Sequence, residues 1–112
     1  MAKHTVYQIK RANRELASNA LFYGSTTAFT KATAIKAFAE QQYRRTADVE
    51  AENNRQVKDL VNNDRTNSLV LSLGGLRNVN IGDIIYNHET DTYVLVAPDN
   101  KYDRVKVKVR LK

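Results

Sequence analysis

Few side chains in this 112-residue sequence have the types and spacing that catalysis or metal binding requires. Cysteine is absent, which excludes thiol nucleophiles, disulfides and thiolate metal sites. The two histidines are His4, at the N-terminal end, and His88, in an expected loop, and these positions do not favour a metal-binding or general-base role. We therefore expect no enzyme activity, no cofactor and no metal.

Two further motifs that could bind ions are interpreted as turns. Asp99, Asn100 and Asp103 lack the spacing and the closing glutamate of a calcium loop. Gly74-Gly75 is followed by neither Lys-Ser nor Lys-Thr and precedes no expected helix, unlike a phosphate-binding loop. Both motifs have the composition of ordinary connections between strands.

The clearest chemical pattern is the cationic C-terminal segment. The chain has 18 Lys and Arg residues against 12 Asp and Glu, for a net charge of +6. Residues 1–100 contain twelve cationic and eleven acidic side chains, and residues 101–112 contain six and one, so nearly all the excess is in this segment. Its cations alternate with apolar residues, which predicts a strand with an apolar and a cationic face that attracts polyanions or acidic proteins. The cationic positions are Lys101, Arg104, Lys106, Lys108, Arg110 and Lys112.

Two tyrosines are predicted to join this cationic surface. If residues 88–91 and 98–101 are four-residue loops, Tyr86 faces Tyr93, which in turn faces Lys106. Rings beside cations are typical of surfaces that bind phosphates and stack on bases. The same features also stabilise hairpins and protect edge strands, so this simpler interpretation stays open. The register also gives an inward row, Ile85, Val94 and Val105, and a parallel outward row, Ile84, Leu95 and Arg104.

The first half of the chain favours helices. Apolar spacing over residues 5–23 predicts one helix, although the alternation of residues 5–10 leaves a strand pair open. A second helix is expected from about residue 27 to residue 62, and its length of about 33 residues would make a rod of roughly 50 Å. This helix either breaks near Asn53-Asn54 or projects toward another subunit. Arg44-Arg45, with Arg55 and Lys58 further on, would then form its solvated face or a second polyanion contact.

The second half favours strands. A buried strand is expected at residues 69–73, ended by Gly74-Gly75, and further strands at 83–86, 92–97 and 102–111. The predicted fold class is α+β: an N-terminal helical part with one long helix, followed by a small antiparallel β-meander or half-barrel. Residues 1–112 would form a single domain, mainly helical over 1–63 and mainly β over 64–112.

The segment from residue 81 to residue 96, IGDIIYNHETDTYVLV, resembles a hairpin of small SH3-like β-barrels. Together with the short chain and the helical N-terminal part, it resembles small bacteriophage virion-assembly or neck proteins. The resemblance implies a non-catalytic assembly component and carries no individual functional residue.

These patterns predict a non-catalytic interaction or assembly protein, plausibly phage-encoded, that acts in an oligomer or larger complex through a basic β face. One alternative is a nucleic-acid-binding accessory protein that contacts the phosphate backbone. Another is a small inhibitor that docks on an acidic groove of a host protein. A small-molecule substrate is not expected. No apolar run has the length of a membrane span, so the expected location is cytoplasmic, in a host cell or a virion.

Overall fold

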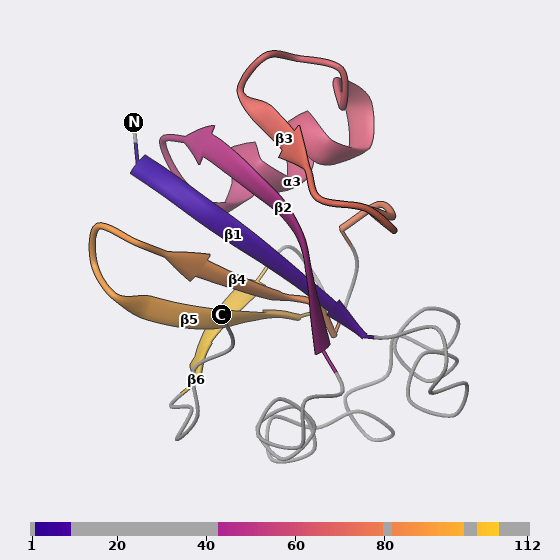
Figure 1. Ribbon diagram of the computed structural model, residues 1–112. Helices are drawn as coiled ribbons and strands as arrows, with labels where there is room; N and C mark the ends of the chain where they lie inside the picture. The colour runs from indigo at the N-terminus through magenta and orange to yellow at the C-terminus, as the bar shows by residue number, and fades with distance from the viewer. Residues whose placement is uncertain (1, 10–42, 80–81, 98–100, 106–112) are drawn as a thin grey trace.

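The computed structural model contains one antiparallel sheet with strand order β3-β2-β1-β4-β5-β6 (Figure 1). The structure describes residues 2–9, 43–79, 82–97 and 101–105. The strands are β1 (Ala2–Ile9), β2 (Tyr43–Ala51), β3 (Val70–Ser72), β4 (Ile84–Asn87), β5 (Thr92–Ala97) and β6 (Lys101–Val105). Within these ranges the one helix is α3 (Asn54–Asn63), so the predicted N-terminal helical part with a long helix is wrong.

The central strand is β1, which pairs with β2 on one side and β4 on the other. The strand interpretation that the sequence left open is thus confirmed for residues 5–9, while residues 10–23 lie outside the described ranges. The β1–β2 register shifts between Val6 and Tyr7, because Ala47 faces Val6 and Arg45 faces Tyr7. Thr46 is the extra residue of this bulge, and its hydroxyl donates to the Val6 carbonyl at 3.3 Å.

The middle of the predicted long helix is a strand. In β2, Ala47, Val49 and Ala51 recur at every second residue and are all buried. Burial against neighbouring strands therefore outweighs the good helix propensity of this stretch. The helix begins only after Asn53, whose side chain accepts a hydrogen bond from the Gln56 amide at 2.9 Å as an N-cap. The expected helix over residues 27–42 lies outside the described ranges.

The helix α3 covers one face of the sheet. Its buried residues Val57 and Val61 belong to an apolar cluster with Val6 of β1, Ile85 of β4 and Val96 of β5. The opposite face of the sheet is also largely buried. The residues buried there are Tyr7, Ile9, Tyr43, Ile84, Tyr93 and Leu95.

The strand predicted at residues 69–73 is present as β3, but its predicted burial is wrong. This strand pairs with β2 at the edge of the sheet, and Leu71 is 60% exposed. By contrast, β4, β5 and β6 are consecutive neighbours, and the span expected for 92–97 matches β5. The strand expected at 83–86 is displaced by one residue, and residues 106–111 of the last expected strand lie outside the described ranges.

Candidate functional site

The predicted tyrosine pair is present in the structure. Tyr86 faces Tyr93 across β4 and β5, as the four-residue loop 88–91 predicts, and their ring centroids lie 4.4 Å apart. Tyr93 is only 7% exposed and also contacts Tyr7, at 6.3 Å between centroids. Tyr86 is half-buried, and its hydroxyl donates to the Asp91 carboxylate at 2.5 Å. The ring of Tyr93 is therefore packed in the fold and is not open for stacking on a base.

The predicted pairing of β5 with β6 is shifted by one residue. Tyr93 faces Val105 and not Lys106, because Lys101 already belongs to β6 opposite Ala97. Only residues 98–100 connect the two strands, so the expected four-residue loop is one residue too long. Because side chains alternate along a strand, this single step moves each side chain of β6 to the other face.

The shift separates residues that the sequence analysis grouped together. Ile85 faces Val94 and Ile84 faces Leu95 as predicted. The last member of each predicted row is wrong, because Arg104 faces Val94 on the helix side of the sheet and Asp103 faces Leu95. Lys101 and Arg104 are both exposed, on opposite faces of β6. Lys106, Lys108, Arg110 and Lys112 lie outside the described residues.

A polar cluster lies beside the Tyr86–Tyr93 pair, on the side toward β1 and β2. Thr5 is fully buried and faces Asp48 on one side and Tyr86 on the other. Its hydroxyl donates to Asp48 Oδ1 at 2.7 Å and lies 2.6 Å from His88 Nε2. The His88 ring is also edge-on to Tyr86, with centroids 4.6 Å apart. The fold thus brings together three side chain types found in hydrolytic triads: a hydroxyl, an imidazole and a carboxylate.

Counting hydrogens shows that this cluster is not arranged to activate a nucleophile. A hydroxyl has a single hydrogen, and an ionised carboxylate can only accept. The hydrogen of Thr5 therefore goes to Asp48, and His88 Nε2 must be protonated to donate to Thr5 Oγ1. In an activated nucleophile the histidine accepts the hydroxyl proton, which is the reverse direction. The hydrogen bond between Thr5 and His88 therefore stabilises the fold and does not activate the hydroxyl.

Asp48 carries the negative charge of the cluster. Burial alone would raise the pKa of Asp48, but hydrogen bonds from Arg45 and Thr5 and the charges of Arg45 and Lys3 outweigh it and lower the pKa. Arg45 Nη2 lies 2.5 Å and Lys3 Nζ 3.7 Å from Asp48 Oδ2. Both Arg44 and Arg45 belong to β2, so the helical face predicted for them is wrong.

Both histidines are held in the neutral form near neutral pH. Burial lowers the pKa of His4, and burial together with the charge of Lys3 lowers the pKa of His88. His4 Nδ1 contacts the Ala2 carbonyl at 2.9 Å, while the His88 backbone amide donates to the Lys3 carbonyl at 3.0 Å. His4 Nε2 is buried and has no hydrogen-bond partner within the described part of the chain.

Sequence reasoning missed the Thr5, Arg45 and Asp48 part of this cluster. Thr5 and Asp48 are 43 positions apart, and no local spacing connects them. The alternation of residues 5–10 was the only available signal, because it places Thr5 on a strand face.

The remaining observations give no cofactor or family. Among the described residues, no three His, Cys, Asp or Glu side chains are grouped closely enough to hold a metal ion. No helix in the same ranges has the length and apolar character needed to cross a membrane. Comparisons of the chain with protein-family models, curated proteins and solved structures gave no match.

Proposed function

We propose that this protein is a non-catalytic interaction protein that binds an acidic protein partner through β6 and works in an oligomer or larger complex. The observation that carries the proposal is that Lys101 and Arg104 are exposed, one on each face of β6, which is an edge strand of the sheet that the described residues form. No carboxylate within the described ranges forms an ion pair with either side chain. Exposed cations along an open edge favour association with an acidic surface.

Two further observations support a binding role over a catalytic one. The hydroxyl of Thr5 and the Nε2 atom of His88 hydrogen-bond within one cluster that also contains the ionised Asp48, and the direction of these bonds does not activate the hydroxyl. At the other edge of the sheet that the described residues form, Leu71 of β3 and the neighbouring Leu73 are 60% and 38% exposed. Exposed apolar side chains on an edge strand favour self-association.

The resemblance to phage virion-assembly proteins remains a prediction, and it loses one of its supports because the helical N-terminal part on which it partly rested is wrong. The nucleic-acid alternative loses the predicted tyrosine pair as a stacking platform, because the ring of Tyr93 is buried.

A binding comparison tests the proposal. The probes are polyglutamate and duplex DNA, and the variants are Arg104→Glu and the double variant Lys101→Glu/Arg104→Glu. Arg55→Glu, an exposed arginine on α3, is the matched control. We expect polyglutamate binding to weaken about tenfold or more in the β6 variants, a change of about 1.4 kcal/mol, and to be unchanged in the control. Equal losses in all variants, or binding of DNA alone, would contradict the proposal.

Light scattering tests the oligomeric part separately. We expect the wild-type protein to associate as its concentration rises and Leu71→Ser/Leu73→Ser to associate less. A wild-type protein that stays monomeric throughout would remove self-association while leaving the binding result intact.

A further inference from the structure

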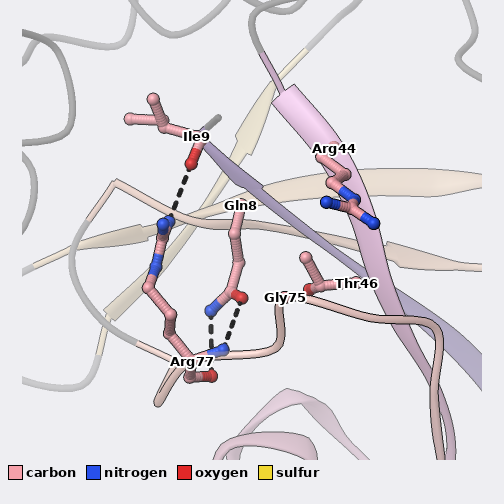
Figure 2. Close-up of a pocket in the computed structure, with 6 residues that line it drawn as sticks. All are labelled: Gln8, Ile9, Arg44, Thr46, Gly75 and Arg77. Carbon is pink, nitrogen blue, oxygen red and sulfur yellow. Dashed lines mark hydrogen bonds between the residues drawn. The ribbon is translucent and has the colours of Figure 1, made fainter. Parts of the chain in front are cut away.

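A small cavity with two arginines lies at the opposite end of β1 from the polar cluster. It has a volume of about 100 Å³ and opens between the ends of β1 and β2 and the segment that precedes β4 (Figure 2). No acidic residue of the described chain lines it. The lining residues are Gln8, Ile9, Arg44, Thr46, Gly75 and Arg77.

Arg77 is held in place by the last two residues of β1, Gln8 and Ile9. The Gln8 side chain accepts from the Arg77 backbone amide at 3.0 Å and donates to the Arg77 carbonyl at 3.1 Å, as Figure 2 shows. Gln8 is itself buried and also donates to Asp83 at 3.0 Å. The Arg77 guanidinium donates to the Ile9 carbonyl at 2.9 Å through Nη2. Its position is thus set before any ligand binds.

The same guanidinium has donors to spare. Its Nε atom is buried and has no hydrogen-bond partner. A buried donor without a partner is unfavourable, so an acceptor that reached the Arg77 guanidinium would recover part of that free energy. Nearby Thr46 offers no free donor, because its hydroxyl hydrogen goes to Val6.

Arg44 supplies the second charge. It faces Gln8 across β1 and β2, is exposed, and forms no ion pair with a carboxylate of the described residues. Its guanidinium lies against Gly74 and Gly75, where a Cβ atom on Gly74 would be 3.1 Å from Nη2. Both glycines have positive φ, +103° and +70°, which side chains rarely adopt. The two glycines therefore allow the loop to approach Arg44 closely.

We propose that this cavity binds one phosphate group. No carboxylate of the described residues forms an ion pair with Arg44 or Arg77. The two guanidiniums match the charge of about −1.5 to −2 that a phosphate monoester carries at neutral pH. Arginine forks bind phosphate oxygens in bidentate geometry. The volume of about 100 Å³ is several times the roughly 10–15 Å³ that a cavity needs to hold one water, so a group larger than water has room to enter. The site is separate from β6, so it does not depend on the proposed function.

The test is a titration of the full chain at constant ionic strength, in which NMR chemical shifts report binding. The probes are inorganic phosphate and glycerol phosphate, and acetate serves as a singly charged comparison. We expect saturable shifts at Gly75 and Arg77 with the phosphates and at least tenfold weaker binding of acetate. The phosphate that binds more tightly identifies the source, as a free ion or as the end of a larger molecule.

Arginine variants decide whether the cavity is responsible. Arg44→Ala removes an exposed side chain and is expected to weaken phosphate binding at least tenfold with unchanged thermal stability. Arg77→Lys keeps the charge but loses the fork, and should also weaken binding. Arg55→Ala on α3 and Lys101→Glu/Arg104→Glu on β6 should leave it unchanged. Absence of saturable binding to the wild type, or an equal loss in Arg55→Ala, would overturn the proposal.

Discussion

Thr5 and His88 are hydrogen-bonded across 83 positions of sequence, with 2.6 Å between Oγ1 and Nε2, and the imidazole is the donor. The bond ties the β4–β5 loop to the central strand β1, alongside the backbone bond from His88 to the Lys3 carbonyl. The cluster therefore contributes to the stability of the sheet, and its members can be tested as structural residues.

Thr5→Val should destabilise the protein by about 1–3 kcal/mol. The substitution keeps the β-branched shape but leaves the buried Asp48 oxygen and the His88 donor without their common partner. Urea denaturation measures the free energy of unfolding. Thr66→Val, at an exposed position, is the control and should change it by less than about 0.5 kcal/mol. Equal effects of the two substitutions would argue against the hydrogen-bonded cluster.

Stability should fall in acid partly because of Asp48. Its pKa is lower in the folded than in the unfolded protein, so the unfolded state binds the proton more tightly. The stabilisation is present above the ordinary value of 3.8 and is lost as the pH falls through the lowered pKa. Asp48→Asn should be less stable at neutral pH and show a flatter dependence below pH 3.8. Urea denaturation in that range measures both, and Asp59→Asn on α3 should keep the wild-type slope.

Stability should also fall at alkaline pH, and the ionisation of Tyr7 should cause part of this loss. Burial, with a smaller effect of Tyr93, raises the pKa of Tyr7 from 10.0 to about 12. The stabilisation is complete below pH 10 and is lost as the pH rises toward 12, because the unfolded chain ionises first. Tyr7→Phe should reduce this loss. Denaturation on either side of pH 10, with tyrosinate absorbance as a second readout, measures it. A slope identical to that of the wild type would contradict the burial of Tyr7.

One substitution at a buried position and one at an exposed position separate the observed fold from the predicted meander. Ile85→Ala removes a fully buried side chain and should cost about 2–5 kcal/mol. Leu71→Ala removes a side chain that is 60% exposed and should cost less than about 0.5 kcal/mol. Thermal or urea denaturation compares them. A large cost at Leu71 would favour the buried strand predicted at residues 69–73.

The local part of the fold could be predicted from the sequence. The four-residue loop 88–91 and the alternation around it place Tyr86 opposite Tyr93, because a hairpin register depends only on the loop and its flanking residues. The span of β5 is predictable for the same reason. At the next turn, a difference of one residue in loop length changed the face on which Arg104 lies.

Pairing between strands that are distant in the sequence decided the rest of the fold. Residues 43–51 have the composition of a helix, yet they form β2 because β1 and β3 pair with both of its edges. The same pairing brings Asp48 to Thr5 and Arg44 to Gln8. The sequence by itself determined the excess of cationic side chains, the absence of thiol chemistry and the local β4–β5 hairpin. Only the tertiary structure decided which polar side chains meet, because hydrogen bonds between strands join residues whose separation along the chain leaves no periodic signal.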